Sequence, residues 1–219
     1  MNKYLKETIL WVIMLLPFVY LANVWNILPE QVPTHFNMDG NADDWSSKTA
    51  LIYIIGGLVF GNYILMLVVP IIDPKKKIQQ MGEKYFTFRL MLAVFMSLLA
   101  IFIVYSGNDG SIKHPNFLFA LIGVLFTMLG NYFQTVRPNY FIGIRTPWTL
   151  ESENVWKSTH RLGGKLWMVG GIMIAVLAFI ISNNHIYSMV FGVIIFVMAA
   201  VPLVHSYLAY KKEKSSLKK

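Results

Sequence analysis

Six long apolar runs constrain the fold of this chain more than any other feature. A run of about 18 or more apolar residues is typical of a membrane span, because about 20 helical residues cross about 30 Å of hydrocarbon. Backbone groups in lipid must be satisfied within the chain, so each run is predicted to be helical. The runs cover residues 9–28, 50–72, 86–105, 116–136, 165–182 and 186–205.

The composition agrees with a membrane protein. Hydrophobic residues make up 56% of the 219 residues and charged residues only 14%, whereas about a quarter of a soluble domain is charged. We therefore predict an all-α polytopic membrane protein with six transmembrane helices and a short interfacial helix in the fourth connection. The first run is too long for a signal peptide and lacks a small-residue cleavage site, so we interpret it as retained. The absence of cysteine excludes disulfides and thiolate metal sites.

Basic residues predict the orientation of the spans. All but Lys48 and Lys113 of the 19 lysines and arginines lie on one side of a six-span arrangement. Positive charge marks the cytoplasmic side, so both termini are predicted to be cytoplasmic. The net charge of +8 is then a topology signal, and no direct nucleic-acid partner is expected. The basic tail is suited to contact with anionic lipid.

Spans and charge together divide the chain into four parts. Residues 1–72 are expected to form a two-span module with an external loop, and residues 73–115 a basic cytoplasmic loop and the third span. Residues 116–208 are expected to form a three-span region with a cytoplasmic loop at 137–164, followed by a basic tail at 209–219.

The loop at 137–164 combines turn residues with a helical pattern. Thr149 is expected to cap a helix with Glu151 and Glu153 in its first turn, where the helix dipole favours carboxylates. Gly163 is expected to end this helix in the left-handed conformation. One explanation of the basic residues here is that they bind lipid phosphates and only fix the topology.

The same loop resembles the signature of the SdpI family. The shared motifs are Gly130-Asn131-Tyr132, Arg137-Pro138-Asn139, Gly143 to Thr149, Val155-Trp156 and Thr159-His160-Arg161. SdpI-family proteins are bacterial membrane proteins named for an immunity protein against a sporulation-delay toxin peptide. On this resemblance the candidate binding residues are Asn131, Arg137, Pro138, Asn139, Gly143, Arg145, Thr146, Pro147, Trp148, Trp156, His160 and Arg161.

The first external loop raises a second resemblance. Its pattern Leu-Pro-x-x-Val-Pro-x-His-x-Asn-x-x-Gly, at residues 28–40, is similar to a short membrane module at the N-terminus of longer SdpI-like proteins. The candidate residues here are His35, Asn37, Asp39 and Gly40. A calcium loop beginning at Asp39 is an alternative, but Asp44 and Ala50 stand where the calcium loop needs glycine and glutamate. We expect a turn with polar side chains bonded to the backbone, and no metal.

The resemblance implies a function that the composition does not. It implies resistance to a secreted, membrane-active peptide toxin at the bacterial cell membrane, and a transcriptional repressor held at that membrane. On this resemblance the expected partners are the lipid bilayer, the toxin and such a repressor, with no cofactor.

Two other classes of function remain open from the residues. A transporter or channel needs broken helices or charged groups near the midplane; Pro17 and Pro70 are present, but no mid-span carboxylate is. An intramembrane enzyme needs a nucleophile and base, and His160 is the one plausible acid–base group. We expect that the protein is not an enzyme.

Overall fold

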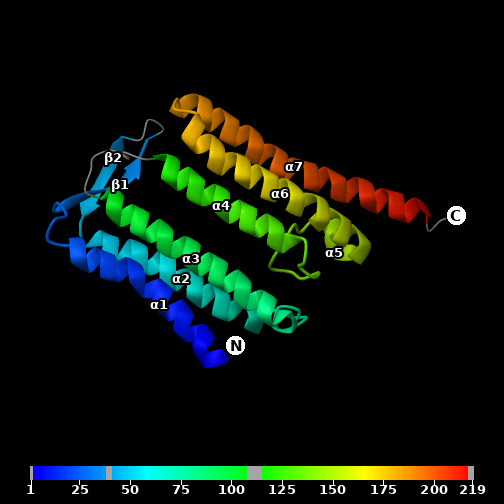
Figure 1. The fold of residues 1–219 in the computed structure, drawn as a ribbon. Helices are drawn as coiled ribbons and strands as arrows, with labels where there is room; N and C mark the ends of the chain where they lie inside the picture. Colours follow the sequence, from blue (N-terminus) through cyan, green and yellow to red (C-terminus); the bar gives the residue numbers. More distant parts are fainter. Residues whose placement is uncertain (1, 38–40, 108–114, 217–219) are drawn as a thin grey trace. The chain divides into compact units, whose positions relative to one another are not determined.

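The computed structural model describes residues 2–37, 41–107 and 115–216, and it is almost entirely helical (Figure 1). The helices are α1 (Lys3–Val24), α2 (Ala50–Ile72), α3 (Glu83–Ser106), α4 (Pro115–Phe133), α5 (Pro147–Glu151), α6 (Glu153–Ile180) and α7 (Asn184–Ser216). A 3₁₀ turn, η1 (Gln79–Met81), precedes α3. Among the described residues, every helix except α5 is long and apolar enough to cross a membrane. The all-α class and the six spans are confirmed.

The chain forms two compact units. Unit 1 comprises Met1–Val68 and Phe86–Leu121, and unit 2 comprises Val69–Tyr85 and Ile122–Lys219. The division into four parts by spans and charge stays a prediction.

In unit 1 the helices α1, α2 and α3 share one apolar core. Its members come from all three helices and from the segment that joins α1 to α2, so the core joins that segment to the three helices. They are Met14, Leu21, Leu28, Val32, Leu51, Ile55, Val59, Ala100 and Val104.

The segment between α1 and α2 is a β-hairpin, which the sequence did not predict. Strands β1 (Gln31–Phe36) and β2 (Ala42–Ser47) pair antiparallel, with irregular register after Pro33 and after His35. Val32 has no exposed surface and anchors the hairpin in the core. The pairing escaped prediction because β2 is rich in aspartate and serine, which are typical of turns.

An interhelical charge cluster lies near the N-terminal end of α1 in unit 1. The Arg89 guanidinium donates to both carboxylate oxygens of Glu7, at 2.7 and 2.9 Å, and the Tyr63 hydroxyl donates to the same carboxylate at 2.9 Å. A bidentate pair of this kind joins α1 to α3 with defined geometry.

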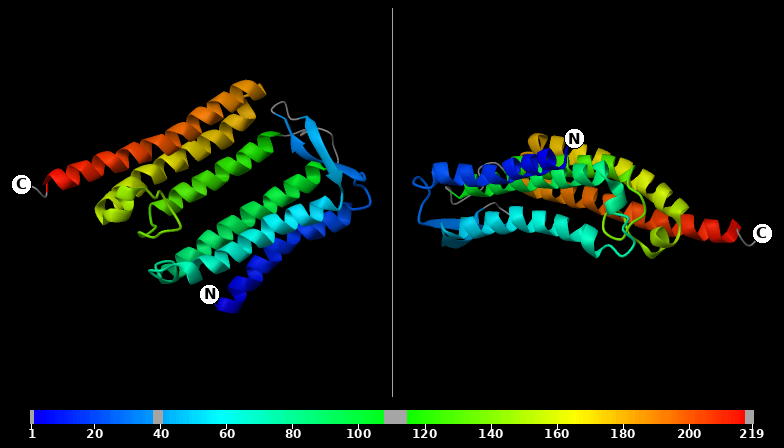
Figure 2. Two further views of the ribbon diagram at one scale, coloured as in Figure 1. Left: turned by 180° about the vertical axis from the view of Figure 1, so that it is seen from behind. Right: turned by 90° about the horizontal axis from the view of Figure 1, so that it is seen from below.

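In unit 2, α6 lies between α4 and α7 and meets each through glycines. A Cβ at Gly171 would lie 2.5 Å from the Gly123 carbonyl oxygen of α4, and a Cβ at Gly164 would lie 2.6 Å from that of Gly130. The residues that precede these two glycines face α7, which runs beside α6 (Figure 2). Gly163 faces Pro202, and Gly170 faces Met198. These glycines therefore allow the three helices to approach closely.

The expected helix end at Gly163 is wrong. The helix α6 continues through Gly163 and Gly164 to Ile180. Gly163 is used for close packing, because Ile144 Cδ1 and the Pro202 ring occupy the space that a side chain would fill. A glycine can serve either purpose, and the neighbours that decide between them are distant in the sequence.

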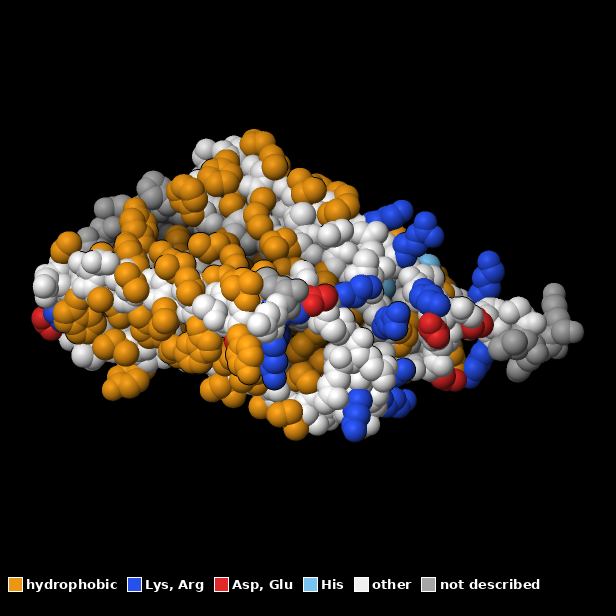
Figure 3. Space-filling view, turned by 60° about the horizontal axis from the view of Figure 1, so that its bottom comes forward, with side chains coloured by type: hydrophobic (Ala, Val, Ile, Leu, Met, Phe, Trp, Pro, Cys, Tyr) orange, Lys and Arg blue, Asp and Glu red, His pale blue; other side chains and the backbone are white. Residues whose placement is uncertain are grey.

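The surfaces of the spans are apolar, as a lipid environment requires. Figure 3 shows hydrophobic side chains over much of one face, with lysine and arginine side chains gathered toward the end of α7. Exposed examples on α7 include Val193, Phe196 and Leu208, which are 64%, 71% and 56% exposed.

Candidate functional site: the signature loop of unit 2

The buried side chain of Asn139 organises the turn that follows α4. Its amide nitrogen donates to the carbonyls of Arg137 and Ile142, at 2.8 and 3.0 Å. Its oxygen accepts from the backbone N–H groups of Phe141 and Ile142, at 2.8 and 2.7 Å. One side chain thus satisfies four backbone groups, which explains why an irregular segment can be buried here.

His160 and Gly143 join this turn to α6. Gly143 has φ +116°, and a Cβ there would overlap His160 Nε2, so only glycine fits. The backbone N–H of Ile144 donates to His160 Nε2 at 2.9 Å, which leaves the ring proton on Nδ1. That proton is donated to the Trp156 carbonyl, 2.9 Å away. Both ring nitrogens of the buried, neutral histidine therefore serve the fold.

Trp156 is the largest side chain enclosed at this site, with no exposed surface. Its indole N–H donates to the Val136 carbonyl at 3.0 Å. Its ring stacks on the His160 ring with centroids 3.9 Å apart. The Phe133 ring in turn packs edge-to-face with the His160 ring. The loop is therefore fixed to the body of unit 2 by aromatic packing as well as hydrogen bonds.

Thr146 begins the short helix α5 and also ties it to α7. Thr146 and Thr149 form reciprocal hydrogen bonds between side chain and backbone, at 2.9 and 3.1 Å, with Pro147 at the first helical position. The Thr146 hydroxyl donates to the Ser206 hydroxyl at 3.1 Å. Trp148 packs on Tyr207, with ring centroids 5.1 Å apart.

Ser152 separates α5 from α6, because its backbone is extended and interrupts the helix. The Ser152 hydroxyl caps α6 and donates to Glu213 of α7 at 2.6 Å, and the Asn154 amide donates to the same carboxylate at 2.9 Å. Hydrogen bonding from Tyr210 and the charge of Lys214 lower the pKa of the Glu151 carboxyl below its ordinary value. The fourth connection does contain a short helix, but the predicted cap was wrong. Thr146 caps α5, and Thr149 is its third residue.

The other candidate residues lie nearer the surface, with Pro138 half-buried and the rest exposed. The Arg145 guanidinium donates to the Tyr140 carbonyl, while Asn131, Arg137 and Arg161 face outward. A cavity of about 710 Å³ lies beside the loop. It is lined by residues that include Lys77, Gln80, Gln134, Arg137, Pro138, Thr149, Glu151, Glu153 and Lys157. The site thus has a buried frame, formed by Asn139, Trp156 and His160, and a charged outer rim that includes Arg137, Arg145 and Arg161.

Comparisons with known proteins match two regions of the chain to family models. Residues 135–206 match the SdpI/YfhL protein family. This region of the chain is SdpI-like. Residues 12–60 match a domain of unknown function, DUF1648. The chain is 27% identical over 214 residues to the immunity protein SdpI of Bacillus subtilis (strain 168), covering 96% of this chain and 99% of that protein. No solved structure matches.

The SdpI-like region, residues 135–206, contains most of the contacts described above. It holds the Asn139 turn, the Trp156–His160 stack, α5 and the contacts from Ser206. The resemblance inferred from the motifs is therefore confirmed. The motifs coincide with side chains that either support the loop or line its rim.

The DUF1648 region contains α1 from residue 12 onward, the hairpin and the start of α2. His35 Nδ1 lies 2.5 Å from an Asp43 carboxylate oxygen, and the Asn37 amide oxygen accepts from the Asn41 backbone N–H at 3.0 Å. Asp39 and Gly40 lie outside the described residues. Within the parts of the chain that are described, no group of three or more His, Cys, Asp or Glu residues is placed to hold a metal.

Sequence reasoning missed three contributors to the site. Ser206 and Glu213 come from α7 and lie 60 and 61 residues after their hydrogen-bond partners Thr146 and Ser152, and Ser152 was not recognised as a helix cap. The motif Ser152-Glu153-Asn154 did carry a signal for Ser152, since serine before a glutamate in the first turn is typical of a helix start. For Ser206 and Glu213 no local signal exists.

Proposed function

We propose that the protein is a membrane immunity protein that protects a bacterial cell from a secreted, membrane-active peptide. The observation that carries the proposal is the match to an immunity protein along nearly the full length of both chains. A shared single motif would support only a shared fold element, whereas a match of this extent includes both units.

The proposed orientation places both termini and the signature loop in the cytoplasm of a bacterial cell. The support is the bias of basic residues described above. The chain contains no cysteine, so a single introduced cysteine reports its own location without background.

We expect a membrane-impermeant thiol reagent applied to intact cells to label Ser46→Cys in the hairpin and not Ser216→Cys at the end of α7. After the cells are permeabilised, both positions should react. Labelling of Ser216→Cys in intact cells would overturn the orientation. Equal expression of the two variants, judged by total protein after permeabilisation, is the control.

In this proposal the protein acts by binding and not by catalysis. His160, the one acid–base candidate from the sequence, uses both ring nitrogens for hydrogen bonds to Ile144 and Trp156. A group engaged in this way is suited to holding the loop. The exposed hairpin of unit 1 would meet the toxin, with His35, Asn37 and the half-exposed Trp45 available on its surface.

The cavity beside the signature loop is the proposed contact for a cytoplasmic partner. Its rim carries both signs of charge, from Lys77, Arg137, Glu151 and Glu153, which suits a polypeptide surface more than a small apolar ligand. The partner that the family resemblance implies is a transcriptional repressor. Co-purification of such a repressor from toxin-treated cells, and its loss with Arg137→Glu, would support this contact.

The function is tested by membrane potential in toxin-sensitive bacterial cells challenged with the sporulation-delay peptide. Cells that express the protein should keep their potential. Arg145→Ala removes a charge-assisted hydrogen bond at the rim, and Trp148→Ala removes the contact with Tyr207. We expect each variant to lose protection at a toxin concentration about tenfold lower than the wild type.

Lys211→Ala is the matched control, because Lys211 is an exposed cation in α7. It should protect as the wild type does. If the loop variants reach normal membrane levels and protect fully, the loop only anchors the topology. If the wild type inserts correctly and gives no protection, the immunity proposal fails for this toxin, and uptake assays in vesicles then test a transporter.

A further inference from the structure

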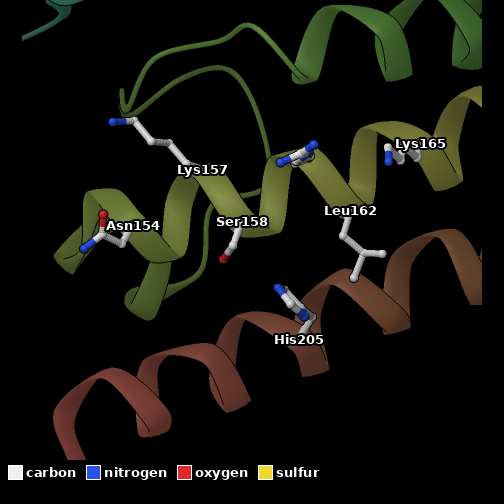
Figure 4. A pocket seen from close by; sticks show the side chains of 7 residues that line it. Asn154, Lys157, Ser158, Leu162, Lys165 and His205 are labelled. Atoms are coloured by element: carbon white, nitrogen blue, oxygen red, sulfur yellow. The ribbon is translucent and has the colours of Figure 1, made fainter. Parts of the chain in front are cut away.

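A second groove in unit 2, of about 490 Å³, lies between α6 and α7 (Figure 4). Three cations of α6 line it, at Lys157, Arg161 and Lys165, and α7 contributes His205. The side chains of Leu162 and Ser158 project toward α7, and the His205 ring projects toward α6 (Figure 4). The groove is distinct from the cavity beside the signature loop, although Lys157 lines both.

The groove carries uncompensated positive charge. Residues four apart lie on one side of a helix, so Lys157, Arg161 and Lys165 form a single basic row. Glu153 neutralises Lys157, with the ion pair at 2.9 Å. Arg161 and Lys165 form no ion pair with any of the residues that the structure describes. Two cations are thus available to an anionic ligand.

His205 adds an unmet hydrogen-bonding atom on the opposite wall. Its Nε2 is enclosed by protein atoms and has no hydrogen-bond partner among the described residues. Leaving such an atom unpaired costs free energy, which a turn of the ring toward the groove and a hydrogen bond to a ligand oxygen there would recover. A neutral imidazole with its proton on Nε2 would donate to an anionic oxygen.

The position of the groove along the helices matches the depth of lipid headgroups. About 20 helical residues cross the hydrocarbon, and 20 residues counted back from Ile180, the last residue of α6, end at Arg161. The same count from His185, near the start of α7, ends at Val204. Arg161 and His205 therefore lie where the hydrocarbon gives way to headgroups.

We propose that this groove binds the phosphate group of an anionic phospholipid. Arg161 and Lys165 bind the phosphate oxygens, and His205 Nε2 completes the coordination. Lipid is favoured over free phosphate because Leu162 lines the groove and the neighbouring Val201 and Val204, on the hydrocarbon side of His205, are 40% and 52% exposed, which provides an apolar path for the acyl chains. This proposal is independent of the immunity function.

The test is the affinity of the purified full-length protein for phosphatidylglycerol, measured by native mass spectrometry in a non-ionic detergent. The wild type should bind phosphatidylglycerol in preference to phosphatidylcholine. Arg161→Gln/Lys165→Gln should raise the apparent Kd for phosphatidylglycerol about tenfold, because each basic residue near an anionic surface adds to binding. His205→Phe keeps the ring size and should raise it about threefold by loss of one hydrogen bond.

Lys211→Gln/Lys212→Gln removes two exposed tail cations and is the matched control, with an expected change below about twofold. An unchanged Kd in the groove variants would overturn the proposal, as would an equal loss in the tail control, which indicates non-specific attraction. Displacement of the lipid by inorganic phosphate at about 10 mM, well above typical affinities for a specific site, would assign the groove to free phosphate. Thermal unfolding of each variant establishes that it is folded, and the single variants Arg161→Gln and Lys165→Gln replace the double variant if it is not.

Discussion

Trp156→Ala should lower the free energy of unfolding by about 3–5 kcal/mol, the range for truncation of a large buried aromatic side chain. Trp156 has no exposed surface, stacks on His160 and donates to the Val136 carbonyl. Its removal would leave a cavity and an unpaired carbonyl, and would release the His160 ring that holds Ile144. We therefore expect the signature loop to lose its fixed structure and protection against toxin to be lost with it.

The measurement is unfolding in detergent micelles, followed by circular dichroism as temperature or denaturant rises. Trp156→Phe keeps an aromatic ring on His160 and loses the hydrogen bond, so it should cost only about 1–2 kcal/mol. Trp148→Ala removes a half-buried indole from the rim and should cost less than Trp156→Ala. A loss below about 1 kcal/mol for Trp156→Ala would show that the stack does not hold the loop.

Gly130→Leu should prevent the close approach of α4 and α6 and cost at least about 3 kcal/mol, the upper part of the range for overpacking. A Cβ at Gly130 would lie 2.6 Å from the Gly164 carbonyl oxygen and would also overlap the backbone nitrogen of Met168. These atoms belong to the backbone of α6, so no rotamer change removes the overlap. Gly123 and Gly171 bring the same two helices together further along. A side chain at Gly130 that pushes α4 and α6 apart would therefore disturb this second contact as well.

Gly192→Leu is the control for this substitution. Gly192 lies in α7, and a Cβ there meets no atom within 4 Å. The two substitutions make the same chemical change within a membrane span, and only their neighbours differ. Folded yield and thermal unfolding in detergent should therefore fall sharply for Gly130→Leu and stay near wild type for Gly192→Leu. Equal behaviour of the two variants would contradict the packing between α4 and α6.

Some features of the site were accessible from the sequence, because they depend on residues close together in the chain. The turn at Asn139 and the proline at the start of α5 belong to contiguous motifs. Local reasoning nevertheless placed the cap of α5 at Thr149, where the structure uses Thr146. Both threonines can cap a helix, and the choice follows from the hydrogen bond between Thr146 and Ser206, which lies 60 residues away.

The role of Gly163 shows the same limit more clearly. Glycine favours a helix end when nothing lies against it, and favours the helix interior when another element must approach closely. Ile144 and Pro202 lie against Gly163, so the helix α6 continues past Gly163 without interruption from its start at Glu153. The hairpin was missed for a related reason, since Val32 is held by a core built from three helices and not by the pattern of its own strand.

The sequence by itself determined the all-α class, the six spans and the resemblance to the SdpI family, because lipid imposes a simple length and polarity requirement on each span. Only the tertiary structure decided which motif residues support the loop and which line its rim. Trp156, His160 and Asn139 are enclosed, while Arg137, Arg145 and Arg161 remain exposed. The physical reason is that burial depends on contacts with α4 and α7, and spacing along the chain does not encode those contacts.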